Sequence, residues 1–267
     1  AKQFNGGVVF NEDSADLDFR VESNGNANAI FVNGGEDTVG IGNSNAHSFA
    51  DNADNLVVGT GSGHNGVTIY SDGSSSGSLF FANGTSGAQV QQGQIVYEQN
   101  NSTMILKTAA NTAISIDGNG HVTKPLQPAF MANKSASGQT PSASTAVTVV
   151  FENEVFDNNA DYNTTNSTFT APVTGRYWFH SRIRADEVGG GTGIYSIRLV
   201  ASNRTIHNTQ VDLSDYLDGT MNRMSFEVSG LLDMDASDTC KVQVFEDSGY
   251  EIEDEVEETF FMGYLVC

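Results

Sequence analysis

The chain has 267 residues, enough for about two domains, and carries a formal net charge of -21 with an isoelectric point near 4.3. Phosphate contacts need clustered Lys and Arg, so this charge argues against nucleic-acid binding and against binding to anionic membranes. No apolar run is long enough to span a bilayer, and the opening residues AKQFNGG do not form a signal peptide. The acidity instead favours a soluble protein on an exterior surface.

Residues 1–124 consist of short apolar runs separated by Gly, Asn and Ser. Examples are LDFRVES, NAIFVNGG, GVTIYSDG and GSLFFANG, with turn signals such as Asn33-Gly34 and Asp72-Gly73 between the runs. No helical period is present, so the pattern predicts β-strands. Each strand has few large apolar residues, and a single copy would expose its strand edges. We therefore expect this segment to associate with identical copies, either interwoven or side by side.

The segment HVTKPLQPAF, residues 121–130, marks a boundary. It contains two of the four prolines of the chain and ends the Gly-rich runs. Proline is disfavoured in central strands, so a linker or a docking strand fits this position. We predict a Gly/Asn-rich β shaft over residues 1–124 and a second domain over residues 125–267.

Longer runs with more aromatic residues follow this boundary, among them TAVTVVFENEVF, GRYWFHSRIRAD and MNRMSFEVSGLLDM. About eight to ten such strands predict a sandwich or a jelly roll. Alternation along the second of these runs places Tyr177 and Phe179 on one face and Trp178 and Arg182 on the other. The first pair is expected in the core. The second pair faces either a neighbouring subunit or solvent.

The aromatic spacing of this domain resembles the globular head of the complement C1q family, which shares the jelly roll of tumour necrosis factor. The family signature is a spaced series of aromatic and Asn or Asp positions that ends in Gly-x-Tyr-x-Phe-x-aromatic. Ser181 stands at the last aromatic position, and TFFMGYLVC is similar to the closing strand of the family. The residues at matching positions are Phe151, Asp157, Tyr162, Phe169, Gly175, Tyr177, Phe179 and Gly263.

The C1q resemblance implies an all-β jelly roll that forms a homotrimer, with the signature aromatics in its core and near the trimer axis. Some domains of the family hold calcium near the apex of the trimer. The acidic segment 246–258 carries eight carboxylates and no basic residue, and hard cations prefer such oxygen ligands. The segment is therefore either a solvated loop or a calcium site. The candidate calcium ligands are Glu251, Glu253, Asp254, Glu255 and Glu257.

Residues 19–43 and 56–87 resemble the shaft and intermediate regions of bacteriophage tail fibres, notably those of phages that infect marine bacteria. This resemblance implies a virion appendage that joins other virion proteins at its N-terminal end. It also implies that loops of the terminal domain bind a glycan or protein receptor on the host surface. The candidate receptor-facing residues are Asp186, Glu187, Asp215, Asp218 and Tyr250.

No catalytic motif is present. The five histidines are scattered without metal-ligand spacing, and no Gly-x-Ser-x-Gly elbow occurs. Carboxylate pairs such as Asp186 with Glu187, or Asp212 with Asp215, could serve glycan cleavage, but we predict that the chain is not an enzyme. The alternatives to a receptor-binding fibre are a structural capsid or neck decoration, a trimerisation cap, a secreted adhesin and a polysaccharide-cleaving tailspike.

Overall fold

The computed structural model describes residues 15–188, 193–212, 221–247 and 250–267. Their regular structure consists of β-strands and two short 3-10 helices, which confirms the predicted all-β class. Within these described ranges, no helix has both the length and the apolar character needed to cross a membrane. The chain divides into two compact units, Ala1–Asp72 and Gly73–Cys267. The predicted boundary between residues 124 and 125 stays a prediction, although it lies between two strands of the second unit.

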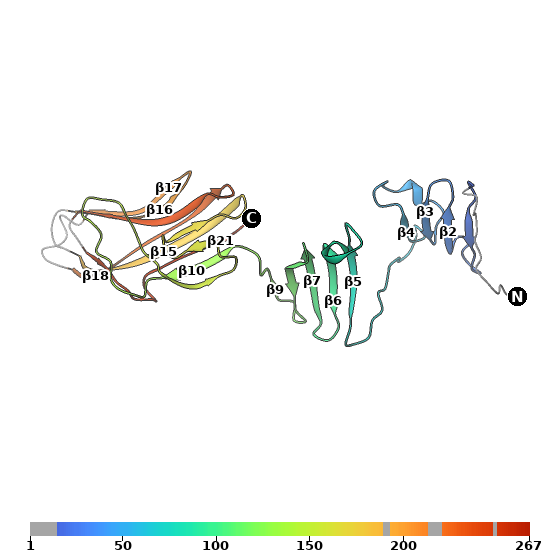
Figure 1. Cartoon of the computed structure of the whole chain (residues 1–267), viewed down its shortest axis with the longest axis horizontal. Helices are drawn as coiled ribbons and strands as arrows, with labels where there is room; N and C mark the ends of the chain where they lie inside the picture. The colour runs from blue at the N-terminus through green and yellow to red at the C-terminus, as the bar shows by residue number, and fades with distance from the viewer. Residues whose placement is uncertain (1–14, 189–192, 213–220, 248–249) are drawn as a thin grey trace. The chain divides into compact units, whose positions relative to one another are not determined.

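The first unit contains one four-stranded sheet, drawn in blue in Figure 1. The first three strands pair antiparallel, and the last pair is parallel. Little of this unit is buried within one chain, since Leu56 is 61% and Val67 is 72% exposed. Its elements are β1 (Phe19–Val21), β2 (Ile30–Asn33), β3 (Thr38–Ile41), η1 (Ala46–Ser48) and β4 (Leu56–Val58).

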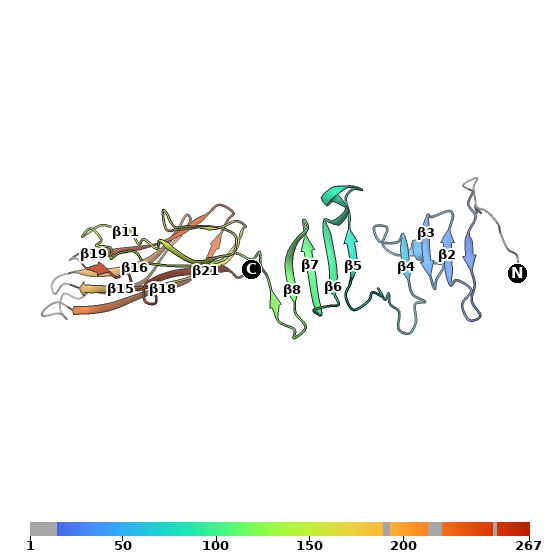
Figure 2. The ribbon, with the colours of Figure 1, turned by 60° about the horizontal axis from the view of Figure 1, so that its bottom comes forward.

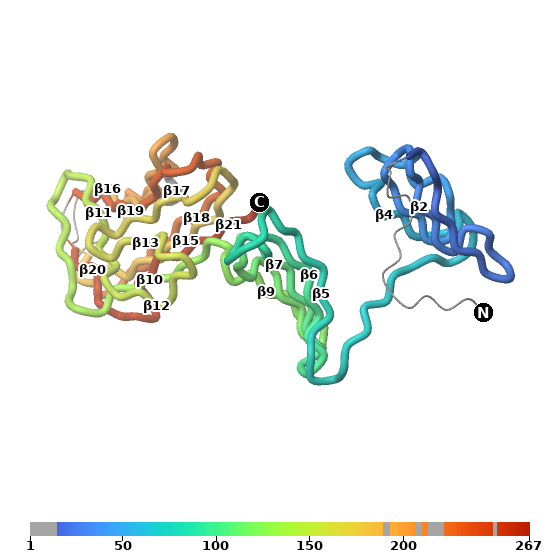
Figure 3. The backbone as a smooth tube through the Cα atoms, turned by 45° about the vertical axis from the view of Figure 1, so that its right-hand side comes forward, coloured from blue at the N-terminus to red at the C-terminus, as the bar shows by residue number. Residues whose placement is uncertain are grey.

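The second unit begins with a five-stranded antiparallel meander, in which β5 to β9 pair in chain order (Figure 3). A two-residue turn joins β7 to β8, with Ala109 and Ala110 at φ values of 48° and 63°. Two positive φ angles match the turn type that follows the twist of a hairpin. The elements are β5 (Ser76–Phe81), η2 (Gly87–Gln91), β6 (Gly93–Glu98), β7 (Thr103–Thr108), β8 (Asn111–Ile116) and β9 (Val122–Thr123).

Two six-stranded antiparallel sheets follow and pack face to face as a jelly roll (Figure 2). We name them the β15 sheet and the β19 sheet, each after a long strand that pairs on both of its sides. The β15 sheet contains β10 (Ala129–Asn133), β12 (Asn153–Asp157), β15 (Gly175–Val188), β18 (Met221–Met234), β20 (Glu251–Ile252) and β21 (Phe260–Leu265). The β19 sheet contains β11 (Val147–Thr148), β13 (Tyr162–Asn163), β14 (Thr168–Thr170), β16 (Ile194–Ala201), β17 (Thr205–Asp212) and β19 (Thr239–Glu246).

Aromatic side chains from both sheets fill the space between them. The Phe130 ring stacks on Tyr162 and Phe169, with ring centroids 4.8 and 5.0 Å apart, and meets Phe261 edge-on at 5.0 Å. Pairs at these separations add to the stability from apolar burial. The aromatic signature residues therefore lie in this core. Those with no exposed surface are Phe151, Phe169, Tyr177 and Phe179, and Tyr162 is 5% exposed.

The signature positions that are not aromatic shape the backbone around the core. Asp157 accepts hydrogen bonds from the amides of Tyr162 at 2.7 Å and Asn159 at 3.2 Å, which closes a turn. A Cβ atom on Gly175 would lie 2.7 Å from Leu265, and one on Gly263 would overlap the Phe179 ring. Both positions therefore require glycine because of close packing.

Ser181, where the family signature has an aromatic residue, is fully buried opposite Phe261. Its hydroxyl donates to the carbonyl oxygen of Phe260 at 2.9 Å. A buried hydroxyl with a partner avoids most of the cost of desolvation.

We predict that Phe169→Ala lowers the free energy of unfolding of the jelly roll by about 3–5 kcal/mol, because it removes a buried ring and leaves a cavity. Trp178, the only tryptophan of the chain, reports the transition by its fluorescence during denaturant unfolding. Val173→Ala is the control, since Val173 is 46% exposed and its loss should change stability little. Equal midpoints for the two variants would contradict the assigned core.

Candidate self-association face

The side chains of β15 that point away from the core lie in register with those of its two neighbouring strands. Trp178 lies between Tyr264 of β21 and Leu231 of β18, and two residues further along His180 lies beside Met262. Across the rest of the sheet, β21 pairs with β10 and β10 pairs with β12. The side chains of these five strands that point away from the core form what we call the outer face of the β15 sheet. It comprises Met131, Phe156, Trp178, His180, Leu231, Phe260, Met262 and Tyr264.

Aromatic rings contact one another on this outer face as they do in the core. Trp178 stacks on His180 at 5.8 Å and tilts against Tyr264 at 5.5 Å, and His180 lies 5.4 Å from Phe260. Within one chain, Leu231 is 49% exposed and Tyr264 is 47% exposed. A continuous exposed apolar surface of this kind marks an interaction site more often than ordinary surface.

Charged side chains replace the apolar ones toward the other end of the same sheet. Arg184 is nearly buried and donates two hydrogen bonds to the Asp186 carboxylate, at 2.8 and 2.7 Å. Glu255 and Glu258 lie 3.6 and 3.3 Å from the same guanidinium. The hydrogen bonds to Asp186 raise the pKa of Arg184 above its ordinary value, so it carries a permanent charge.

The acidic segment therefore surrounds an arginine in a single chain. Of the candidate calcium ligands, Glu255 faces Arg184, Glu251 lies in β20, and Glu253 donates its backbone amide to the Arg184 carbonyl. Desolvation, followed by the nearby Asp186 carboxylate, raises the pKa of Glu253.

Asp254 and Glu257 are exposed. Over the described ranges, no group of three or more His, Cys, Asp or Glu side chains could hold a metal ion. One chain does not assemble the calcium site from these residues, and a site built by three chains stays a prediction.

The candidate receptor-facing residues are in different environments. Asp186 is engaged by Arg184, whereas Glu187 is exposed at a φ of 54°. Tyr250 is only 4% exposed and packs 5.8 Å from Tyr195, so the single chain does not present it to a receptor. Burial raises the pKa of Tyr250. Asp215 and Asp218 lie outside the described residues.

The strand register places the two ends of the jelly roll. Val188 pairs with Met221, and Ile194 pairs with Asp212, so the connections that follow β15 and β17 leave from the same end. The chain enters the domain at Ala129, which pairs with Tyr264. Tyr264 in turn pairs with Trp178, near the start of β15. Val188 and Asp212, after which the chain runs on into these connections, thus lie at the end opposite to chain entry.

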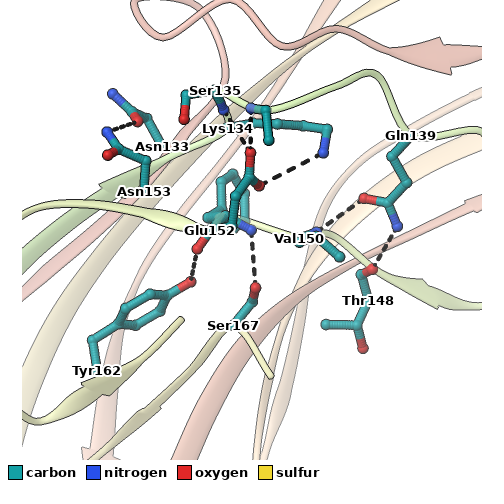
Figure 4. Close-up of polar contacts among 12 residues, drawn as sticks. Asn133, Lys134, Ser135, Gln139, Thr148, Val150, Glu152, Asn153, Tyr162 and Ser167 are labelled. Atoms are coloured by element: carbon teal, nitrogen blue, oxygen red, sulfur yellow. Dashed lines mark hydrogen bonds and ion pairs between the residues drawn. The ribbon is translucent and has the colours of Figure 1, made fainter. Parts of the chain in front are cut away.

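A polar network positions β12, the edge strand that carries Phe156 (Figure 4). One carboxylate oxygen of Glu152 accepts from the amides of Ser135 and Ala136 at 2.8 and 2.6 Å, and the other lies 3.7 Å from the nearly buried Lys134 ammonium. Further hydrogen bonds of 2.7–3.1 Å extend this network. The Gln139 side chain bonds to the backbone of Thr148 and Val150, and the hydroxyls of Ser167 and Tyr162 bond to the backbone of Phe151. The side chains of Asn153 and Asn133 bond to each other.

Partial burial by itself raises the pKa of Glu152, but the amides of Ser135 and Ala136 and the Lys134 ammonium outweigh it. The net pKa of Glu152 is below its ordinary value of 4.5. A carboxylate whose pKa is lowered on folding stabilises the fold above its unfolded pKa, and this contribution is lost as the pH falls through the folded pKa.

We therefore expect Glu152→Gln to be less stable than the wild type at neutral pH and to approach it as the pH falls below 4.5. Denaturant unfolding at a series of pH values measures this difference. The exposed neighbour Glu154 supplies the control, because Glu154→Gln replaces a carboxylate at an exposed position and should change the stability at neutral pH little. A Glu152→Gln difference that stays constant with pH would contradict this role.

Sequence reasoning identified Trp178 on the outward face but not its neighbours Leu231 and Tyr264, which lie 53 and 86 residues further along the chain. The alternation of each strand was available in the sequence. The pairing register that brings the three strands together was not. The Glu152 network was likewise missed, because its partners gave no motif in the sequence.

Comparison with known protein families identifies the domain. The family model for the C1q domain matches residues 129–266, which span the jelly roll from β10 to β21. This confirms the resemblance found in the aromatic spacing. No curated protein matches the chain.

Several solved structures are similar to the jelly roll. The globular domain of the zebrafish complement 1qA protein is 17% identical, with a TM-score of 0.38, and the match covers 53% of this chain and 98% of that one. Eiger TNF from S. frugiperda is 12% identical with a TM-score of 0.42, over 53% and 94% of the two chains. Murine APRIL is 13% identical with a TM-score of 0.39, over 52% and 99%.

Proposed function

Because the chain belongs to the C1q domain family, whose domains form homotrimers, we propose that three copies associate through the outer face of the β15 sheet. The observation that carries this proposal is the row of Tyr264, Trp178 and Leu231, which is apolar and partly exposed in one chain. Burying such a surface is favourable, and the patch has the aromatic composition typical of interface centres. The charged end around Arg184 would then lie at the rim.

We propose further that the trimer is the terminal domain of a virion appendage, such as a bacteriophage tail fibre, that binds the host surface. Three features support this role. Residues 19–43 and 56–87 resemble fibre shafts, and two β-sheets precede the C1q domain. The loops that follow β15 and β17 leave from the end opposite to chain entry. Three copies of a weak site would bind one cell with strong avidity.

Binding in this proposal is to a glycan or a protein receptor, and other virion proteins hold the N-terminal end. A purely structural role, as a trimerisation cap, uses the same outer face but no receptor contact. The two roles differ in whether the loops matter once the trimer has formed.

The proposed trimer predicts that Leu231→Asp prevents assembly. Leu231 is exposed in one chain, so the substitution spares the fold, but in the trimer it would bury an unpaired charge at a cost of several kcal/mol. Light scattering after size exclusion should give about 85 kDa for the wild type, three times the 28.4 kDa of one chain, and about 28 kDa for the variant.

Lys241→Asp is the control, because Lys241 projects from the outer surface of the β19 sheet. It should keep the mass of the wild type. A Leu231→Asp protein that retains this mass would exclude the outer face as the interface.

The proposed receptor role predicts that purified trimer blocks virion adsorption to host cells. Reversing the charge of Asp215 and Asp218 together should leave the mass unchanged and weaken this competition by roughly tenfold or more, since several kcal/mol of binding commonly rest on a few residues. Asp235→Lys at the opposite end is the matched control. Undiminished competition by the double variant would favour the trimerisation cap.

A further inference from the structure

The five-stranded sheet β5–β9 has one face that is almost entirely apolar. The register aligns Leu79, Ile95, Leu106 and Ile114 in one row across β5 to β8. The adjacent row on the same side contains Tyr97, Met104, Ile116 and Val122. We call these eight residues the apolar face of the meander.

The opposite side of the same sheet is mixed in character, and we call it the mixed side. Gln94 pairs with Lys107, and the row beside it runs from Ser78 through Val96 to Ile105. The two charged residues of these strands, Lys107 and Glu98, both fall on this side, because they alternate with the apolar-face residues along β6 and β7. No charge of these strands would therefore need to be desolvated to bury the apolar face.

The apolar face is more exposed than the centre of the mixed side, although Phe80, on the mixed side of the edge strand β5, is itself 53% exposed. On the apolar face, Leu79 is 52%, Val122 is 58% and Ile95 is 38% exposed. On the mixed side, Val96 and Gln94 are only 6% and 7% exposed. Within residues 73–123, all of them described, β5 to β9 form a single layer with one short helix against β5 (Figures 2 and 3). The apolar face has no second sheet from this segment to cover it.

Backbone pairing limits how this face can be covered. Each of β5 to β9 pairs with its neighbour in the same chain, so the ladder leaves only the two edge strands open. Strands of another copy therefore cannot enter the middle of the sheet. Contact has to be made by the side chains of the apolar face, as in sheet-on-sheet packing.

The connection to the C1q domain identifies the partner. Only residues 124–128, with prolines at 125 and 128, separate the end of β9 from the start of β10. Five residues span at most about 18 Å. A trimer of C1q domains would hold three copies of the sheet on such short connections, which corresponds to an effective concentration on the order of millimolar.

We propose that the apolar faces of three copies pack against one another, side by side around the three-fold axis, rather than exchanging strands. This inference rests on the proposed trimer. It assigns to residues 73–123 a second self-association surface whose partner is the same sheet of the other two chains. Six-residue strands about 20 Å long suit such a closed three-sided core.

Thiol labelling in the full chain tests this packing. Cys267 is exposed and Cys240 is buried, so Cys267→Ser supplies a background with no reactive thiol. Ile95→Cys then places a thiol on the apolar face, and Thr112→Cys places a matched thiol on the mixed side of β8. We expect maleimide to label the Ile95→Cys thiol at least about tenfold more slowly in the trimer than in the Leu231→Asp monomer. The Thr112→Cys thiol should label at the same rate in both.

The outcomes separate this inference from the proposed trimer. Rapid labelling of the Ile95→Cys thiol in a particle three times the mass of one chain would overturn the packing of the meander alone. Protection of this thiol that persists in the Leu231→Asp monomer would also overturn it, because the cover would then come from the same chain. A wild-type particle with the mass of one chain would overturn both proposals. A short bis-maleimide that joins chains in the Ile95→Cys protein but not in the Thr112→Cys protein would support the packing directly.

Discussion

Side-chain alternation along β15 governs both the core and the outer face of the C1q domain. This one strand pairs with neighbours on both of its sides, sends Tyr177 and Phe179 into the core, and sends Trp178 and His180 to the opposite surface. Because the period of a strand is two residues, a slip of one position would exchange these two sets. Core and outer face are therefore built by the same strand, and neither can change register without the other.

Side-chain alternation also gives the meander β5–β9 an apolar side, but this side is left exposed in one chain. Its apolar residues also share one side, but within residues 73–123 no second sheet lies against them, so Leu79 and Val122 remain more than half exposed. The jelly roll covers its apolar side with a second sheet of its own chain. In the packing proposed above, the meander obtains its second layer from other copies of itself, because the short linker to the C1q domain would keep them close in a trimer.

Charged residues mark the end of the apolar part of the outer face. In a chain with a net charge of -21, the few basic residues occupy specific places. Arg184 neutralises part of the acidic segment through Glu255 and Glu258, and Lys134 meets Glu152 where the chain enters β12. Such ion pairs contribute little to stability when they are exposed. They matter when they are half buried, because a buried charge without its partner carries a cost of desolvation. The apolar outer face and the charged end around Arg184 are therefore distinct zones of one sheet.

Local patterns in the chain were enough to predict the all-β class, the strand GRYWFHSRIRAD with its two faces, and the C1q signature, because alternation and fixed spacing involve neighbouring residues. The acidic segment suggested a cation site for the same local reason, yet no local pattern could show that Arg184 lies among those carboxylates. The folded domain alone established that Tyr250 is buried and that Leu231, Trp178 and Tyr264 form one row. Strand pairing brings together residues far apart in the chain, and its register is set by the packing of the whole sandwich rather than by any one segment.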